Sequence, residues 1–501
     1  MRRFALCTLL ALGGACRGAP ATHRLVIALP IGPDSLVPNA SEEEFARAVL
    51  ENVYEPLVEI DSNLSLRPCL AESWHNPDDL TWIFHLRDAV RLHDGRLLDA
   101  RMVAASLEKA RAISEPEGEL SRVAEITAAD ARTLRFRTRA PFAALPSRLS
   151  SVLVSADPLR PGERAVGTGP YRLQSWTPGA STVLEAFPAY RLGRPPIDVV
   201  EFQVVPDARE RIRRLREGRV HLIVDVSPEE MAGLVSAPGI RTVSYGGLRA
   251  LFLVMDCARE SNPRVSGPTN PFRDARVRRA LALAIDADDL VRRALGGYGE
   301  RVNQLPTPKE FGYDPGLPRR SVDRAEARRL LAAAGRPRGF SAELDYMPGK
   351  YLAMEAVVRA LAAELLEIGI RVDLRPAPPD VFLKRIQARD TALYVIGWLN
   401  DTASAEITYE SMLHTPGGGL GIDNGGGYSN PELDRLIESA SRSLNPGARA
   451  LLLKRAAAIV YEDVPLVPLY RQADLYAYAS RLAFEPRLDR RMRLAQLRSS
   501  E

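Results

Sequence analysis

The sequence predicts a mixed α/β protein with two lobes, and three observations lead to this prediction. Strand-like and helix-like segments alternate in the first half of the chain, as in βαβ units. The half after residue 257 is richer in helices but still holds apolar, strand-like runs at 371–374 and 393–396. The chain then returns to strand-like residues at 470–478. A last segment that rejoins the first lobe links two lobes by more than one crossover and leaves a cleft between them.

Hydrophobic periodicity and turn residues define the expected elements of the first half. A period of two over 82–92, ending in His93-Asp94-Gly95, predicts a β-ribbon, and Asp99 is expected to cap the helix that follows. The other expected strands are 25–29, 171–176, 181–186, 199–205, 220–224 and 251–256, and the expected helices are 42–53, 100–112 and 208–216.

Capping residues mark the helices of the second half. Asp274 and Asp323 are expected N-caps, and Asn430-Pro431 is a typical cap followed by a proline at the first helical position. Gly335 and Gly369 are expected to end helices. The predicted helices begin after Asp274 and cover 324–334, 352–368 and 432–443. We find no internal repeat.

A tight turn is expected at Gly167-Thr168-Gly169-Pro170-Tyr171. Two glycines around a threonine allow backbone angles that a Cβ would forbid, and Pro170 fixes φ at the start of an extended segment. By itself the motif predicts only a rigid turn into a strand.

Composition and charge exclude several functional classes. The chain has 501 residues, 46% of them hydrophobic, and a net charge of +4. Of its 67 basic residues 62 are arginine, but they alternate with acids and form no basic block, which argues against nucleic-acid binding. The chain has no HExxH, GxSxG or Walker motif, and its six histidines show no metal-ligand spacing. His85 and His93, eight residues apart, are the one conceivable metal pair, and we expect ordinary hydrogen-bonded histidines there.

The N-terminus has the pattern of an export signal. Arg2 and Arg3 precede an apolar stretch at 4–12 that is too short to span a bilayer. The stretch ends in Leu12-Gly13-Gly14-Ala15-Cys16, and small residues before a cysteine are typical of bacterial lipoprotein signals. We expect residues 1–16 to form this signal segment, with lipid attached to Cys16 after cleavage before it.

Two further cysteines, Cys69 and Cys257, remain in the mature chain. They could pair in an oxidising compartment, but the sequence does not show whether they are close. Two buried free thiols is the interpretation that we favour. No cysteine or histidine spacing indicates a structural metal.

The segment Gly397-Trp398-Leu399-Asn400-Asp401 is the candidate binding site. It follows the apolar strand at 393–396, so Asp401 is expected just past a strand end, where α/β lobes place ligands. Trp398 supplies a broad, partly polar wall. A carboxylate in a closed cleft is costly unless a cation pairs with it, so Asp401 would suit a cationic group of a ligand. A loop acid that caps a helix start is the alternative.

Several short motifs, in collinear order from about residue 24 to 490, resemble the extracytoplasmic solute-binding proteins of peptide and nickel ABC transporters, solute-binding family 5. Each motif is weak alone, but together they are specific. They are Tyr54-Glu-Pro-Leu-Val58, Leu70-Ala-Glu-Ser-Trp74, Phe84-His-Leu-Arg87 with His93-Asp-Gly95, Gly167–Tyr171, Pro271-Phe-Arg-Asp274, Arg276-Val-Arg278, Ala284-Ile-Asp286, Gly397-Trp398 and Glu462-Asp-Val-Pro465.

The resemblance implies the two-lobed fold of the periplasmic binding proteins, with an extra subdomain inserted in the first lobe. It places the first lobe at 24–60, 157–252 and 478–501, the insert at 61–156 and the second lobe at 257–475. In peptide-binding members the acid of a Gly-Trp-x-x-Asp element holds the ammonium of the ligand, and Asp401 occupies that place. Trp398 would line side-chain pockets, and Tyr470 falls where a tyrosine near the hinge can contact ligand.

The resemblance also implies a function. We expect a lipid-anchored, periplasmic or extracytoplasmic binding protein, monomeric and without a cofactor, metal or enzymatic activity. It would capture a small solute, with peptide expected, by hinged lobe closure and deliver it to ABC permease subunits with cytoplasmic ATPases. Carriage of a nickel chelate, oligosaccharide or opine is an alternative, and a peptide-sensing or chaperone-like protein without transport is another.

Two departures from the family pattern concern the ligand. Thr-Ala-Ser-Ala-Glu406 follows Asp401 where Asp-Pro is often found, and Arg191 follows Tyr190 where a tryptophan is common. An arginine that binds a peptide carboxylate cannot be chosen from 62 candidates.

Overall fold

The computed structural model describes residues 23–499 except 42, 115–117, 157–164 and 401. The expected signal segment with Cys16 and the candidate ligand residue Asp401 therefore lie outside the described residues. In the part of the chain that is described, no helix is long and apolar enough to cross a membrane.

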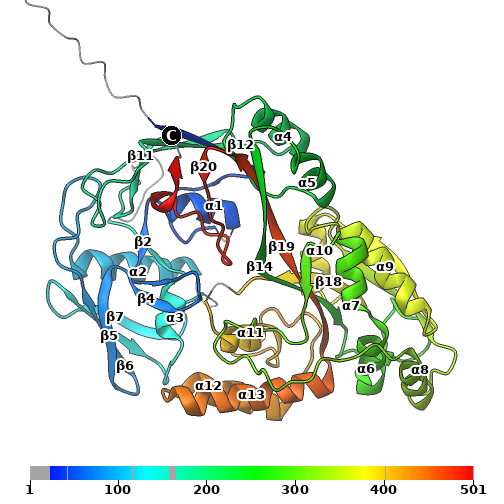
Figure 1. The fold of residues 1–501 in the computed structure, drawn as a ribbon. Helices are drawn as coiled ribbons and strands as arrows, with labels where there is room; N and C mark the ends of the chain where they lie inside the picture. Colours follow the sequence, from blue (N-terminus) through cyan, green and yellow to red (C-terminus); the bar gives the residue numbers. More distant parts are fainter. Residues whose placement is uncertain (1–22, 42, 115–117, 157–164, 401, 500–501) are drawn as a thin grey trace, which may run out of the picture.

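One main sheet runs through the molecule and, among the described residues, contains eleven strands (Figure 1). Their order is β10-β11-β12-β1-β13-β19-β14-β18-β16-β17, and β15 pairs with β19. Their bounds are β1 Arg24–Leu29, β10 Tyr171–Thr177, β11 Ser181–Ala186, β12 Val199–Val204, β13 Leu222–Ile223, β14 Ile240–Met255, β15 Gly299–Arg301, β16 Phe340–Tyr346, β17 Ile370–Pro376, β18 Leu393–Trp398 and β19 Leu466–Ala479.

Two long antiparallel strands, β14 and β19, form the middle of this sheet. On one side β1 runs parallel to β12 and β13, and on the other β16 runs parallel to β17 and β18. Parallel strands need crossover helices, so each side has its own α/β layer. We call the β1 side lobe I and the β16 side lobe II, and we call β14 and β19 the linking strands. The predicted residue boundaries of the lobes remain a prediction, because the sheet continues across them.

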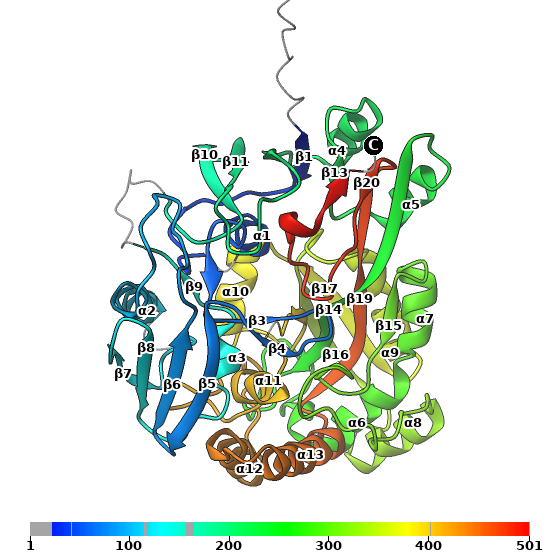
Figure 2. The ribbon, with the colours of Figure 1, turned by 60° about the vertical axis from the view of Figure 1, so that its left-hand side comes forward.

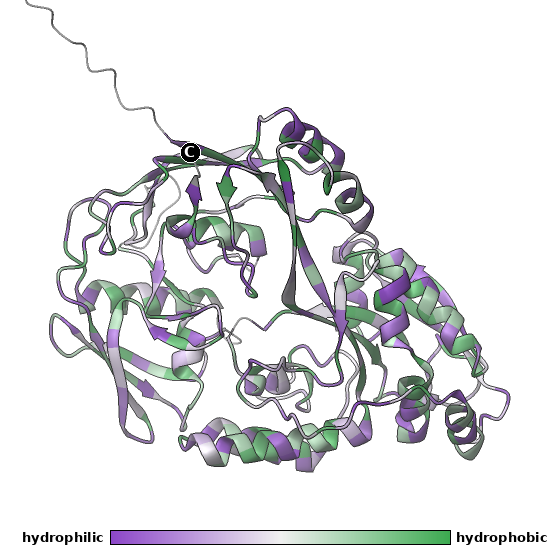
Figure 3. Ribbon diagram, in the orientation of Figure 1, coloured by the Kyte–Doolittle hydropathy of each residue, from purple (hydrophilic) through white to green (hydrophobic). Residues whose placement is uncertain are grey.

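Separate sets of helices pack on the lobe I half and on the lobe II half of the sheet. Amphipathic helices expose one polar face, and Figure 3 shows hydrophobic and hydrophilic residues mixed along α12 and α13. The helices are α1 Glu44–Leu50, α2 Ala100–Ser114, α3 Leu145–Leu149, α4 Ala208–Arg216, α5 Pro228–Leu234, α6 Ala275–Ala284, α7 Ala287–Asp289, α8 Arg324–Ala333, α9 Met354–Leu366, α10 Pro379–Gln387, α11 Ala405–Met412, α12 Pro431–Arg442 and α13 Pro446–Asp463, with shorter turns η1 Pro271–Arg273, η2 Leu290–Ala294 and η3 Leu494–Gln496.

A second, four-stranded sheet of order β5-β6-β8-β7 packs with α2 and α3 around its own apolar core, which includes Phe84 and Phe136. We call these strands and helices the small-sheet unit; Figure 2 shows it beside lobe I, with α12 below it. Its strands are β5 Ala71–Asp78, β6 Thr81–Leu86, β7 Val123–Ala128 and β8 Thr133–Thr138, and the remaining short strands are β2 Glu55–Pro56, β3 Val58–Ile60, β4 Leu66–Pro68, β9 Leu153–Val154, β20 Leu482–Ala483 and β21 Arg498–Ser499.

The expected helix caps are confirmed. The carboxylates of Asp99, Asp274 and Asp323 and the amide oxygen of Asn430 each accept a hydrogen bond from a backbone N–H in the first turn that follows. Other expectations were wrong. β14 begins at Ile240 rather than 251, β6 ends at Leu86 rather than 92, and α10, α11 and α13 were missed.

The Gly167–Tyr171 turn needs its glycines for a reason other than the expected one. Neither Gly167 nor Gly169 has positive φ. Instead, a Cβ on Gly167 would lie 2.1 Å from the carbonyl oxygen of Val53, and one on Gly169 would lie 2.4 Å from that of Asn52. The turn packs directly on the chain after α1, where the N–H groups of Gly169 and Tyr171 donate to these two carbonyls at 3.0 Å. The glycines are therefore required by close backbone approach.

His93 joins the same turn and is not half of a metal pair. Its Nδ1 accepts from the N–H of Gly167 at 3.2 Å, and its Nε2 lies 3.0 Å from the carbonyl oxygen of Gly169. This arrangement requires the neutral Nε2–H tautomer, and burial lowers the pKa of His93 to about 4. His85 instead stacks on His75 in the small-sheet unit, and no group of three or more metal-ligating side chains occurs among the described residues.

We predict that Gly169→Ala lowers the free energy of unfolding by about 1–3 kcal/mol, because the new methyl group has no room beside the Asn52 carbonyl. Urea denaturation followed by circular dichroism measures the change. Gly233→Ala, within α5, is the matched control: a Cβ there meets nothing within 4 Å, and alanine favours the helix. Equal stability of the Gly169 variant and the wild type would contradict the packing role.

Candidate ligand-binding site

The loop between β18 and α11 is held in place by the buried side chain of Asn400. Its Nδ2 donates to Glu310 Oε2 at 2.6 Å and to the Ser404 carbonyl at 2.8 Å. Its Oδ1 accepts from the N–H and hydroxyl of Thr402. Burial raises the pKa of Glu310 to about 7. The two residues that flank Asp401 are thus buried and hydrogen-bonded to each other.

A second chain segment holds the other end of this loop. The N–H of Phe311 donates to the Ala403 carbonyl at 3.0 Å, and the N–H of Ala405 donates to the Phe311 carbonyl at 2.9 Å. Ala403 has positive φ, which turns the chain sharply into α11. The loop that carries Asp401 is therefore anchored on both sides, although Asp401 itself lies outside the described residues.

Trp398 is the last residue of β18 and lies opposite Ala250 of the linking strand β14. Its indole Nε1 donates to the hydroxyl of Thr408 in α11 at 3.0 Å. The ring is partly buried, and this hydrogen bond fixes its orientation. The indole thus forms a rigid surface between β14 and the start of α11.

Tyr470 does not share a sheet face with Trp398. In the register, Tyr470 and Gly397 both pair with Leu251, whereas Trp398 pairs with Ala250. Directly opposed residues of an antiparallel pair point to the same face and consecutive residues to opposite faces, so the two aromatic rings project from opposite sides. Tyr470 is fully buried, and its hydroxyl has no hydrogen-bond partner. The structure does not bring these two predicted site residues together.

Arg249 is a residue near the candidate site that sequence reasoning missed. Its Cδ would lie 3.3 Å from a Cβ on Gly397, and its guanidinium lies over the ring of Tyr351. Its Nη2 donates to Glu44 of α1 at 2.7 Å. Arg249 follows a β-bulge at Gly246, and a Gly-Gly pair inside a strand pattern is the signal that could have found it. This arginine therefore connects α1 of lobe I to the linking strand β14.

Arg490 is paired with three carboxylates beside the linking strands. It forms ion pairs with Glu44 at 2.6 Å, Asp225 at 2.5 Å and Asp474 of β19 at 3.1 Å. Burial raises the pKa of Asp474 to about 7 despite the opposing effect of Arg490. Glu44 thus binds both Arg249 and Arg490, and the pairs tie α1 to both linking strands.

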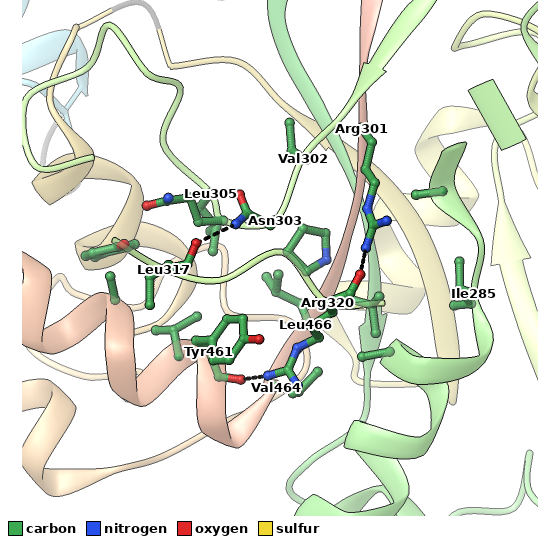
Figure 4. A pocket seen from close by; sticks show the side chains of 18 residues that line it. Ile285, Arg301, Val302, Asn303, Leu305, Leu317, Arg320, Tyr461, Val464 and Leu466 are labelled. Carbon is green, nitrogen blue, oxygen red and sulfur yellow. Dashed lines mark hydrogen bonds between the residues drawn. The ribbon is translucent and has the colours of Figure 1, made fainter. Parts of the chain in front are cut away.

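The cavity in Figure 4 lies within lobe II and is separate from the candidate site. It holds about 40 Å³ and is lined by β15, the segment after it, α13 and β19. That volume suits a water molecule, not a solute the size of a peptide. Arg320 caps it by stacking on Tyr461, and Asn303 donates to the Leu317 carbonyl at 3.3 Å. These contacts hold the segment after β15 against α13.

Cys69 and Cys257 are both unpaired, as the free-thiol interpretation predicts; Cys69 is buried as expected, whereas Cys257 is only partly buried. Burial raises the pKa of both thiols, which leaves them protonated at neutral pH.

The unusual Arg191 is part of the fold near Cys69. Its guanidinium donates twice to Glu55 Oε1, at 2.8 and 3.2 Å, and the hydroxyl of Tyr190 donates to the same oxygen at 3.0 Å. Glu55 is only 2% exposed, so this arginine supplies its countercharge. This departure from the family pattern therefore completes a buried ion pair and gives no information about the ligand.

We predict that Arg191→Ala lowers the free energy of unfolding by about 3 kcal/mol, because it leaves the buried Glu55 carboxylate uncompensated. Guanidinium denaturation measures the loss. Arg194→Ala removes an exposed pair with Asp198 and should cost less than about 1 kcal/mol. Similar losses for the two variants would show that the buried Glu55 carboxylate does not depend on Arg191 for its countercharge.

Comparisons with known proteins all point to one protein family. Residues 65–419 match the model of bacterial extracellular solute-binding proteins, family 5. The chain is 25% identical over 493 residues to the glutathione-binding protein GsiB of Escherichia coli O1:K1, covering 94% of this chain and 93% of that protein.

Two solved structures show the same fold. The periplasmic binding protein DppA of Helicobacter pylori, in complex with peptide STSA, matches with a TM-score of 0.79 and 22% identity, covering 95% of this chain and 98% of that one. NikA of Staphylococcus aureus, in complex with Ni(L-His)2, matches with a TM-score of 0.75 and 19% identity, covering 93% and 97%.

These matches confirm the expected fold class and the expected class of binding protein. The family model spans well over half of the chain, and the solved structures match nearly the whole of it. The protein therefore belongs to family 5 of the bacterial extracellular solute-binding proteins.

Proposed function

We propose that the protein is the solute-binding component of an ABC importer and that its ligand is a peptide. Family membership supports the binding role. The observation that supports the ligand site is the loop after β18: Asn400 is held by buried hydrogen bonds, and Trp398 is fixed at the end of β18 opposite the linking strand β14. A site of this kind, built on rigid elements, can hold the charged end of a ligand in one geometry.

The linking strands supply the mechanism of capture. Lobe I and lobe II are joined in one sheet by β14 and β19, and the pairing of these strands is interrupted by a bulge in β14 after Gly246 and by one in β19 opposite Leu251 and Phe252. Bulges allow a strand to bend and twist locally. A ligand that contacts both lobes would shift the population toward the closed arrangement. The Arg249–Glu44 pair lies at this junction and would set the geometry of closure.

Asp401 would bind the α-ammonium of the peptide, and the Trp398 indole would form a wall of its side-chain pocket. Tyr470 is proposed as a ligand contact only if closure or opening uncovers it, because its side chain is fully buried. The partners would be a permease with cytoplasmic ATPases. Export to the periplasm and a lipid anchor at Cys16 complete the proposal, with the protein acting as a monomer.

Nickel chelates, oligosaccharides and opines are the alternative ligands within the same class, and peptide sensing without transport is the alternative outside it. Competition binding measurements distinguish these ligands from a peptide. Loss of peptide uptake in cells that lack the gene, restored by the gene, separates transport from sensing.

We predict that Asp401→Ala weakens peptide binding by about 2–5 kcal/mol, because it removes one partner of a desolvated charge pair. Isothermal titration calorimetry measures the affinity. The wild type should bind an N-acetylated peptide poorly, and the variant should no longer distinguish acetylated from free peptide. Asp79→Ala, at the exposed turn between β5 and β6, is the control and should bind as the wild type does.

A thermal-shift screen of ligand-free protein against pools of dipeptides, tripeptides and longer peptides tests the ligand class. Ligand at 100 times its dissociation constant stabilises by about 2.7 kcal/mol. We expect a rise in melting temperature with one length class. No rise with any peptide pool, together with a rise on adding a nickel–histidine complex, a sugar or an opine, would overturn the peptide assignment.

A further inference from the structure

The helix α11, which follows the candidate ligand loop, also contacts the small-sheet unit. Glu410 of α11 accepts a hydrogen bond from Arg122 on Oε1 at 2.7 Å and another from Arg148 on Oε2 at 2.9 Å. Glu410 is 3% exposed. Arg122 directly precedes β7 and Arg148 lies in α3, so these ion pairs join α11 to the small-sheet unit, which is distant from it in sequence.

Further contacts extend this interface. The N–H of Ala143 donates to the Ser441 carbonyl of α12 at 3.1 Å, and Arg122 also donates to the Ser441 hydroxyl. Both arginines lie over the ring of Phe142, at 5.2 and 5.8 Å. Ile407 of α11 packs in the apolar core of the small-sheet unit. Figures 1 and 2 both place α11 and α12 next to this unit.

Glu406, one turn before Glu410, is the unusual member of this interface. It is 0% exposed, and neither of its carboxylate oxygens has a hydrogen-bond partner. Its nearest cation is Arg449 of α13, whose Nε lies 3.9 Å away and whose guanidinium is stacked over Phe311. A buried carboxylate without a donor is costly in its charged form.

The charges around Glu406 come from each element that packs against it. Arg449 faces it from α13, Arg122 and Arg148 face it from the small-sheet unit, and Glu410 faces it from its own helix. Both small-sheet arginines are already bound to Glu410, and Arg148 is also bound to Glu119 at 2.9 Å. The cations that could compensate a charged Glu406 are therefore engaged elsewhere or lie too far for a hydrogen bond.

We propose that Glu406 takes up a proton when α11 docks against the small-sheet unit, so that acid conditions favour the closed arrangement of the lobes. This inference rests on the proposed closure and adds its regulation. Separation of the two surfaces would expose Glu406 to water, where its charged form is stable. Docking removes that water and supplies no donor, so the neutral acid fits the interface better than the carboxylate.

The direction of the titration agrees with this geometry. Burial and the neighbouring Glu410 carboxylate raise the pKa of Glu406 to about 7 from an ordinary value of 4.5, whereas for Glu410 the attraction of Arg122 and Arg148 outweighs burial and lowers the pKa. The docked form thus binds more protons than the separated form between about pH 4.5 and 7. Docking should weaken as the pH rises through this range and should be weakest above it.

Small-angle X-ray scattering of the ligand-free protein at pH 5.5 and pH 8.5 tests the proposal. We expect a smaller radius of gyration at pH 5.5. Glu406→Gln, which mimics the neutral acid, should give the compact value at both pH values. Glu432→Gln, an exposed acid on α12, is the matched control and should retain the pH response of the wild type. An equal radius for the wild type at both pH values, or an unchanged response in Glu406→Gln, would overturn the proposal.

Arg449→Met provides a second test if Glu406→Gln fails to fold. It removes the nearest cation, so the transition between compact and extended forms should move to higher pH. A transition at the pH of the wild type would count against the role of Glu406. Because no peptide is present in these measurements, failure of the peptide assignment leaves their outcome unaffected.

Discussion

The pairing of β14 with β19 is the constraint on which the rest of the structure depends. These two strands pair from Ile240 with Ala479 to Val254 with Leu466 and so join the lobes in one sheet. Backbone hydrogen bonds make the connection continuous, while the bulges near Gly246 and Leu251 interrupt its regularity. Such interruptions allow the two strands to bend and twist locally, which is the property that the proposed lobe closure needs.

The same strands position the candidate ligand loop. β18 pairs with β14 along its whole length, so the residue at its end, Trp398, is placed by the register. Asn400 then fixes the loop with four hydrogen bonds, and α11 begins directly after it. Because α11 also carries Glu406 and Glu410, the ligand loop and the contact with the small-sheet unit belong to one continuous segment. Movement of this segment would affect both.

Several buried charges position parts of the molecule relative to one another. Arg490 and Arg249 join α1 to the linking strands, Arg191 supplies the countercharge of Glu55, and Glu410 joins α11 to the small-sheet unit. Ion pairs of this kind contribute little net stability but have a strong preference for one geometry. The high arginine content of the chain is thus used for positioning as well as for surface pairs.

The sequence by itself determined the α/β class, the helix caps and the strands with clear periodicity, because these depend on local propensity and side-chain period. It also indicated a candidate ligand loop through a strand end followed by Trp398. Only the tertiary structure decided what depends on register and close approach: the separate faces of Trp398 and Tyr470, the need for glycine at 167 and 169, and the partner of Arg191. Contacts between residues more than a hundred positions apart leave no periodic signal in one sequence, so no local pattern could have predicted them.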